Sequence, residues 1–398
     1  MGSSIINFIE LERKYKFSQY VIKLFSEKYG QRTENIIRAL KRPCKTYSIR
    51  VNTLKTTPKE VLESLQNQGI QAALHSILEE VINLPVSGPF KIPEHDKKIV
   101  VDKFTAESLI QGADLYAPGV LKTAKIRRGD KVTIITKTGE ILASGKAKMT
   151  ANDMLQLRKG LAVKVVDSIY KIISIRESQL FKEGDIFDQS LPSILVSKVL
   201  DPKLNECILD MCAAPGGKAT HIGQLMQNTG QILAVDRSIQ RIKRIKEHIQ
   251  RLGITNIRIL NDDSRNLSEK YHHWADRILI DPPCSALGVR PKLFDATTEK
   301  EIINMANYQR QFLRSAVKYI KPNGIIVYST CTLTTEENEE NIKFLLDNFD
   351  CKIVEQPIFL GNPGEETEGL LNWQKLQRFY PDIDETAGYF IAKIQMLS

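Results

Sequence analysis

Two apolar runs in the second half of this 398-residue chain end in the same way. One run (278–280) leads into Asp281-Pro-Pro-Cys284, and the other (324–330) leads into Cys331. Such runs are typical of buried parallel strands, and proline ends a strand because it has no N–H to donate. Both cysteines are therefore predicted at the carboxyl edge of one sheet, where open α/β sheets bind ligands. A lone cysteine there would usually be an inert core side chain, but two favour a paired-cysteine active site.

The remaining pattern of the second half predicts the sheet to which these strands belong. Apolar runs alternate with helical segments from residue 191 to the end of the chain, which is typical of a doubly wound α/β fold with a parallel sheet. The predicted strands are 206–211, 231–236, 256–261, 277–281, 324–330, 351–355 and 388–395. The predicted helices are 191–200, 217–228, 238–252, 299–320 and 335–348. We assign residues 173–398 to this domain.

A turn of small residues follows the first predicted strand, and acids end the next two. The turn is Asp210-Met-Cys-Ala-Ala-Pro-Gly-Gly-Lys218, and the acids are Asp236 and the pair Asp262-Asp263. Small residues let a ligand approach the N–H groups of a helix start, and an acid at a strand end typically binds ribose hydroxyls. The turn matches neither a phosphate-binding loop nor G-x-G-x-x-G. This favours S-adenosylmethionine as the cofactor, with a dinucleotide as the alternative.

The first two fifths of the chain are basic and have a different pattern. Residues 1–95 carry 14 Lys and Arg against 9 Asp and Glu, and predict helices over 5–42 followed by a small βα unit. Residues 96–171 carry 15 against 8 and predict short strands separated by turns, which implies a small barrel or sandwich. The basic excess of both parts suggests a polyanionic partner. The predicted domains are thus 1–95, 96–172 and 173–398.

Composition excludes several classes of protein. The six cysteines form no C-x-x-C pair, so we expect neither a zinc site nor a disulfide framework, and no metal. No apolar run is long enough to span a membrane, and residues 1–12 lack the basic lead of a signal peptide. We expect a cytoplasmic monomer.

The middle segment resembles a PUA domain, an RNA-binding barrel. Gly112-Ala-Asp114, Pro118-Gly-Val120, Gly129-Asp130 and Lys159-Gly160 match its pattern. An unrelated small barrel is the alternative.

The motifs together resemble the Sun/RsmB (Nop2/Sun) family of RNA cytosine-C5 methyltransferases. The turn 210–218, Asp236, Asp263 and the two cysteine motifs carry the resemblance, with Arg50-Val-Asn-Thr-Leu54 upstream. It covers about 43–95 and 173–395, on either side of the PUA segment. It implies a seven-stranded Rossmann-like methyltransferase domain, an N-terminal α+β RNA-binding part and S-adenosylmethionine as the cofactor. Members with an inserted PUA domain form a branch that methylates tRNA at the terminal acceptor-stem pair, beside the discriminator base.

The resemblance also implies roles for single residues. Cys331 would attack C6 of the cytosine, Cys284 would release the product, and Asp281 would hold the ring, with Lys218 lowering a thiol pKa or binding the RNA backbone. The implied cofactor-binding residues are Cys212, Ala213, Ala214, Pro215, Gly216, Gly217, Lys218, Asp236, Arg241, Asp263 and Asp281. The implied RNA contacts are Arg50, Asn52, Tyr116, Lys159 and Tyr389, although the two tyrosines could equally be core residues.

Three other functions stay open on the sequence alone. An rRNA cytosine could be the target in place of a tRNA cytosine. A non-catalytic RNA-binding protein would be expected to have lost a cysteine or the glycine turn, and all are present. A DNA cytosine methyltransferase would use Cys284 of the Pro-Cys motif as the nucleophile and would need no PUA domain. We further expect Cys331 to lie at the N-terminus of the helix predicted after it, which would stabilise its thiolate.

Overall fold

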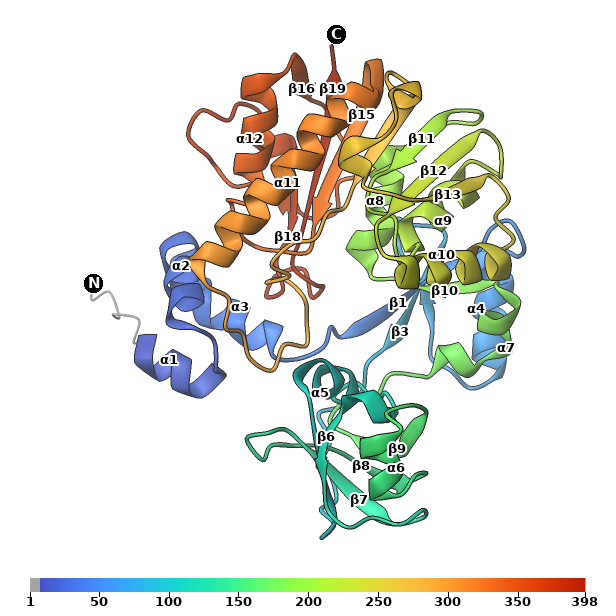
Figure 1. Cartoon of the computed structure of the whole chain (residues 1–398), viewed down its shortest axis with the longest axis vertical. Coiled ribbons are helices and arrows are strands. Elements are labelled where there is room, and N and C mark those ends of the chain that lie inside the picture. Colours follow the sequence, from blue (N-terminus) through green and yellow to red (C-terminus); the bar gives the residue numbers. More distant parts are fainter. Residues whose placement is uncertain (1–7, 398) are drawn as a thin grey trace.

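A computed structural model of the chain describes residues 8–397. It contains a large sheet covered by helices, a second, six-stranded sheet at the opposite end, and the N-terminal helices and a small sheet between them (Figure 1). The predicted start of the first helix, at residue 5, lies outside the described residues. No helix in residues 8–397 is long and apolar enough to cross a membrane.

The large sheet has the strand order β13-β12-β11-β14-β15-β19-β18-β17, and β16 pairs with the other end of β19. The first five of these strands are parallel and β19 runs antiparallel to β15. The strands that correspond to the prediction are β11 (Cys207–Asp210), β12 (Gln231–Asp236), β13 (Ile257–Asn261), β14 (Ala275–Ile280), β15 (Ile320–Thr330), β16 (Cys351–Ile353) and β19 (Tyr389–Met396). Two short strands, β17 (Asn362–Pro363) and β18 (Gln377–Phe379), were not predicted.

Helices cover both faces of this sheet because its central strands are apolar on both sides. Ile278 and Ile280 of β14 pack against α11 and α12, whereas Leu279 between them packs against α8 and α9. The covering helices are α8 (Leu191–Leu200), α9 (Gly217–Leu225), α10 (Ile239–Leu252), α11 (Glu299–Tyr319) and α12 (Glu339–Asn348). The doubly wound α/β fold is confirmed.

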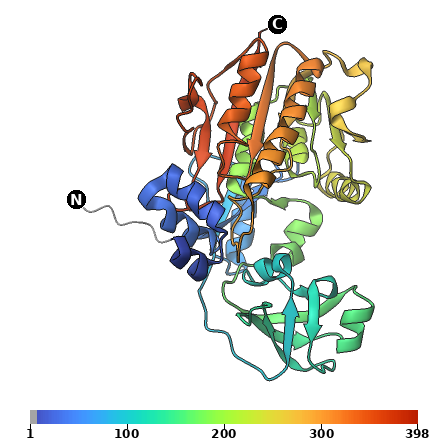
Figure 2. The same ribbon diagram turned by 60° about the vertical axis from the view of Figure 1, so that its left-hand side comes forward.

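The six-stranded sheet has its own hydrophobic core and lies away from the large sheet (Figure 2). Its order is β5-β9-β8-β7-β4-β6, so the strand that follows the first helix of this part pairs with its last strand. The strands are β4 (Lys98–Val101), β5 (Leu115–Tyr116), β6 (Val120–Thr123), β7 (Lys131–Ile135), β8 (Ile141–Ala147) and β9 (Leu161–Ser168), with helices α5 (Lys103–Leu109) and α6 (Ala151–Gln156).

The N-terminal part consists of helices and a four-stranded antiparallel sheet of order β10-β1-β3-β2. Its helices are α1 (Phe8–Tyr15), α2 (Gln19–Tyr29), α3 (Thr33–Leu40) and α4 (Pro58–Asn67), and its first three strands are β1 (Thr46–Val51), β2 (Ala73–Leu74) and β3 (Val81–Pro85). The fourth strand, β10 (Ile186–Asp188), comes after the six-stranded part and after α7 (Gln179–Glu183). The chain therefore returns to complete the N-terminal sheet before it enters the large one.

Arg50 and Asn52 lie inside the interface between the N-terminal sheet and the large domain, and each is only 1% exposed. Arg50 donates to the carbonyl of Gly217 at 2.7 Å and to the hydroxyl of Thr220 at 3.1 Å, both on α9. Asn52 donates to two backbone carbonyls, at 2.8 and 2.9 Å. Both were expected to contact RNA. The structure instead buries them as links between the two parts, where the Nη atoms of Arg50 and the amide nitrogen of Asn52 donate to groups of the chain itself.

The same interface contains a buried histidine. His221 of α9 is fully buried, and its Nε2 lies 3.2 Å from Glu80, which also pairs with Lys198 at 3.4 Å. Burial, and then the charge of Arg50, lower the pKa of His221 to about 4. Because α9 begins at the glycine turn, this interface braces the base of that turn.

Candidate active site

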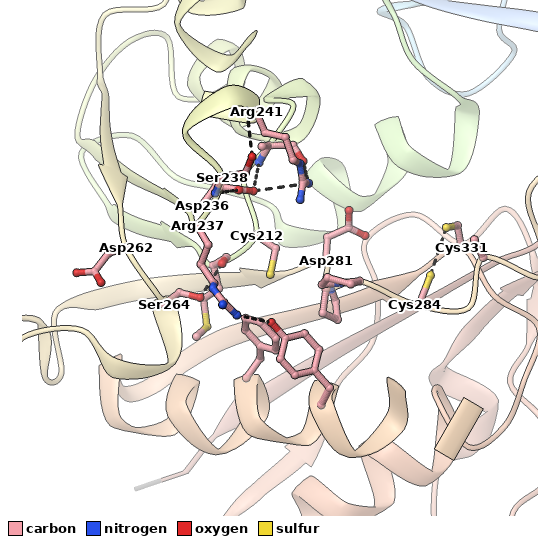
Figure 3. A pocket seen from close by; sticks show the side chains of 17 residues that line it. Cys212, Asp236, Arg237, Ser238, Arg241, Asp262, Ser264, Asp281, Cys284 and Cys331 are labelled. Atoms are coloured by element: carbon pink, nitrogen blue, oxygen red, sulfur yellow. Dashed lines mark hydrogen bonds and ion pairs between the residues drawn. The ribbon is translucent and has the colours of Figure 1, made fainter. Parts of the chain in front are cut away.

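The two cysteine motifs meet at the carboxyl edge of the large sheet. β14 and β15 are parallel neighbours, with Ile280 beside Tyr328, so the segments that follow them leave the sheet side by side. The Sγ atoms of Cys284 and Cys331 lie 3.4 Å apart and face each other (Figure 3). The sequence-based prediction of paired thiols at two strand ends thus agrees with the geometry.

The electrostatics of this pair differ from those predicted. The helix after Cys331 was expected at residue 335, but α12 begins only at Glu339, after a turn, so its N-terminus does not adjoin the thiol. Instead, the hydrogen bond between the two thiols lowers the pKa of Cys331, and the charges of Lys218 and Lys292 lower it further, against burial and the charge of Asp281. The site therefore favours a thiolate on Cys331.

Asp281 holds a polar cluster beside the thiols. Its Oδ2 pairs with Lys218 Nζ at 2.6 Å, and its Oδ1 accepts from Ser329 at 2.8 Å and from Tyr389 at 3.3 Å. Burial disfavours a charge on Lys218, but the carboxylate of Asp281 and the nearby Tyr389 outweigh burial and raise the pKa of Lys218. Tyr389 is buried here and supports Asp281, whereas we had expected it to contact RNA.

The small-residue turn forms one wall of the site. Cys212 and Ala214 line the cavity, and Ala213 is buried behind them, its N–H bonded to the carbonyl of Val235. Gly216 has φ +108, a conformation that side chains with a Cβ rarely adopt, and it begins α9. Pro215 and Gly217 complete the turn.

The acids at the ends of β12 and β13 lie on the cavity wall, with one correction. Asp236 accepts from the N–H groups of Ala214 (3.2 Å) and Ser238 (2.9 Å), which fixes its carboxylate at the cavity edge. Asp262 lines the cavity, whereas Asp263, the predicted ligand, is turned toward Arg265 and pairs with it at 2.6 Å. The predicted ligand and the observed wall residue are neighbours in sequence.

Arg241 also reaches the cavity, from α10. It donates to the carbonyl of Ala214 at 2.6 Å and lies 3.6 Å from Asp236. The guanidinium of Arg241 thus links the small-residue turn to Asp236.

One cavity of about 600 Å³ joins these groups, from Asp236 at one end to Cys284 and Cys331 at the other. Sequence reasoning missed two aromatic residues of its wall, Tyr308 and Phe312 of α11. An adenosine fits this cavity: acids for ribose hydroxyls at one end, aromatic rings at the side, and a glycine turn at its edge. The sulfonium of an S-adenosylmethionine bound in this way would then lie toward the thiols.

The remaining predicted RNA contacts are both exposed and belong to the six-stranded part. Tyr116 at the end of β5 is 57% exposed, and Lys159 lies in the exposed loop before β9. Within residues 8–397, no group of three or more His, Cys, Asp or Glu side chains could hold a metal ion, and all six cysteines are free thiols.

Fold and cavity together define the class of the protein as an S-adenosylmethionine-dependent methyltransferase. The chain belongs to the RsmB/F methyltransferase family, whose profile (16S rRNA methyltransferase RsmB/F) matches residues 197–395. A PUA domain profile matches residues 97–169, and the ferredoxin-like domain profile of the same family matches residues 17–91. The six-stranded part is therefore a PUA domain. The N-terminal sheet belongs to the ferredoxin-like domain of the family.

Three relatives extend over nearly the whole chain. The tRNA (cytosine(72)-C(5))-methyltransferase of Pyrococcus horikoshii is 40% identical over 98% of both chains. The human tRNA (cytosine(72)-C(5))-methyltransferase NSUN6 is 30% identical over 93% of this chain and 87% of its own. The crystal structure of NSun6 from Pyrococcus horikoshii with SFG superposes with a TM-score of 0.87, at 40% identity over 96% of this chain and 99% of that one.

Proposed function

We propose that this protein transfers a methyl group from S-adenosylmethionine to C5 of a cytosine in tRNA, at the terminal pair of the acceptor stem. The observation that carries the reaction is the thiol pair, 3.4 Å apart, at the end of the cofactor cavity. The names of the relatives, which specify cytosine 72 of tRNA, support the position. An rRNA target has less support, because the rRNA (cytosine-C(5))-methyltransferase NOP2C of Arabidopsis thaliana, which matches 94% of this chain, is only 28% identical.

The attack is assigned to Cys331. Cytosine C5 is too weak a nucleophile to accept a methyl group unaided, and addition of a thiolate at C6 makes it enamine-like. The hydrogen bond with Cys284, at 3.4 Å, lowers the pKa of Cys331 and so favours that thiolate. Asp281 accepts a hydrogen bond from the exocyclic amine, and the charge of Lys218 offsets the negative charge that develops on the ring. The cofactor supplies an electrophilic methyl group on its sulfonium.

Release is assigned to Cys284. In the free site the pKa of Cys284 is raised well above its usual value, first by its hydrogen bond to Cys331 and then by burial. Once Cys331 is bonded to carbon, that first cause disappears, so Cys284 ionises more easily. Its thiolate then takes the C5 proton, the electrons of the C5–H bond re-form the C5–C6 double bond, and the Cys331–C6 bond breaks to return a thiolate. Attack by one thiol thus prepares the other.

A denaturing gel of protein mixed with tRNA and cofactor tests this assignment. Cys284→Ala should accumulate a slow-moving covalent protein–RNA band, because attack proceeds without release. Cys331→Ala should give no band and no methylation, and the double variant should behave in the same way. Cys351→Ala is the matched control, because it changes a free thiol on β16 that does not line the cavity. A band in Cys331→Ala instead would assign the attack to Cys284 and overturn the mechanism.

We also propose that the protein acts as a monomer in the cytoplasm. One chain contains both thiols and the whole cavity wall. Free thiols at the reaction centre require a reducing compartment, which supports the cytoplasm.

A further inference from the structure

Glu337 is a buried carboxylate that the proposed reaction does not use. It lies in the turn between β15 and α12 and is 0% exposed. Among the described residues no Lys, Arg or His pairs with it, and neutral groups satisfy its oxygens instead. Burying an unpaired carboxylate is costly even when it is hydrogen-bonded. The hydrogen bonds of Glu337 to the segments beside both thiols indicate what this carboxylate does.

The donors to Glu337 come from three different segments. The N–H of Ser285, the residue after Cys284, donates at 2.9 Å, and the hydroxyl of Ser285 donates as well. Thr334, three residues after Cys331, donates at 3.1 Å. Gln309 of α11 donates at 2.8 Å. One carboxylate therefore joins the segment that carries each thiol to the helix beneath them.

Other hydrogen bonds reinforce this junction. The hydroxyl of Ser285 also lies 2.6 Å from that of Thr332, the residue directly after Cys331. Gln309 donates in addition to the carbonyl of Pro283, directly before Cys284. Cys284 is thus held on both sides in sequence, and both restraints meet at Glu337.

We propose that Glu337 is a positioning residue for product release, which holds the Cys284 segment against the Cys331 segment so that the second thiol reaches the methylated ring. This inference rests on the proposed function. The negative charge of Glu337 also adds, after the Cys331 hydrogen bond and burial, to the raised pKa of Cys284. It therefore helps Cys284 to remain a thiol until Cys331 has reacted.

The test is Glu337→Gln, which keeps the shape but replaces one accepting oxygen by a donor. Glu337 accepts two hydrogen bonds from Ser285, directly after Cys284, but only one from the Cys331 segment, three residues away at Thr334, so release should slow more than attack. We expect turnover to fall roughly 10- to 100-fold, the scale of a small misplacement of a reacting group, and a covalent protein–RNA band to accumulate as in Cys284→Ala. A general loss of stability would lower the active fraction and would not create that band.

Glu339→Gln is the matched control. Glu339 is also 0% exposed and lies two residues further on, but it pairs with Arg378, which donates to the carbonyls of Leu333 and Thr334, and it has no bond to the Cys284 segment among the described residues. Glu339→Gln should lower stability without trapping an adduct. Ser285→Ala removes one donor to Glu337 and should trap a smaller amount, so it decides the question if Glu337→Gln does not fold.

Each outcome discriminates. A band in Glu337→Gln but not in Glu339→Gln supports the inference. If Cys284→Ala traps the adduct while Glu337→Gln and Ser285→Ala only lose activity in step with their folded fraction, the role of Glu337 is refuted and the proposed function stands. If Cys284→Ala traps nothing, the proposed release step fails, and the inference fails with it.

Discussion

Mild acid should loosen the interface between the N-terminal part and the large domain through His221. Burial and the charge of Arg50 lower the pKa of this histidine to about 4, from 6.5 for a free side chain. Below pH 6.5 the unfolded chain therefore binds a proton that the folded chain refuses. Stability that is present above pH 6.5 is lost as the pH falls toward 4, at about 1.4 kcal/mol per pH unit.

The loss of unfolding free energy that His221 causes can be measured between pH 7 and pH 5. Over that range the protonation of His221 in the unfolded state removes about 2 kcal/mol of unfolding free energy. Its partner does not contribute there. Burial raises the pKa of Glu80, but His221 and Lys198 outweigh burial and bring it to about 2, so its stabilising contribution is lost only below about pH 4.5.

Urea unfolding at pH 7, 6 and 5 measures this loss. His221→Gln keeps a donor near Glu80 but cannot titrate, so its stability should fall by about 2 kcal/mol less than that of the wild type. His248→Gln is the comparison: burial lowers the pKa of His248 too, but this ring is only partly buried, against Phe187 of β10, so its replacement should remove a smaller part. Equal losses in the wild type and His221→Gln would show that His221 is not held neutral, and would refute the reasoning.

Two predictions concern RNA binding. Removing residues 96–171 should weaken tRNA binding and flatten its salt dependence, because this segment carries 15 basic against 8 acidic residues; calorimetry should find S-adenosylmethionine affinity unchanged, and an equal loss of both would contradict a modular PUA domain. Tyr116→Ala should weaken tRNA binding by about 1–3 kcal/mol if a base stacks on the exposed ring. Lys159→Ala, in the exposed loop beside Tyr116, is its charge-removing counterpart, and it should reduce binding mainly at low salt.

The parts of the site that local sequence determines were predictable. β12 was predicted with its observed bounds, because its apolar run ends abruptly at Asp236. Cys284 and Cys331 could be brought together from sequence because parallel strands deliver their ends to one edge. The glycine turn was equally local, since φ +108 at Gly216 needs a residue without a side chain.

The rest depends on packing between segments that are distant in sequence. Tyr308 and Phe312 are four residues apart on α11, a spacing that indicates a core face, and nothing local shows that this face also borders the cavity. Asp262 and Asp263 have the same chemistry, and local sequence does not show that Asp263 pairs with Arg265 while Asp262 lines the cavity. Glu337, in a polar turn, has the pattern of a solvated residue, and its donors come from three segments.

The arrangement of the buried contacts explains why the ferredoxin-like part and the methyltransferase part form one working unit. Arg50 of β1 bonds to Gly217 at the cofactor turn. At the other end of the site, the hydroxyl of Tyr29 on α2 donates to the carbonyl of Leu333, two residues after Cys331. The N-terminal part therefore braces both the glycine turn and the segment that carries Cys331.

The PUA domain makes contacts of a different kind. Glu107 of α5 accepts from the N–H of Leu293 at 2.9 Å, and Lys16 pairs with Glu140 at 2.7 Å where both side chains are substantially exposed. Neither contact reaches the cavity wall. Exposed ion pairs contribute little to stability, so the packing of Leu293 on the PUA core is the stronger part of this junction. The PUA domain thus meets the rest of the chain away from the cavity wall, whereas the glycine turn and the segment that carries Cys331 both rest on the buried N-terminal part.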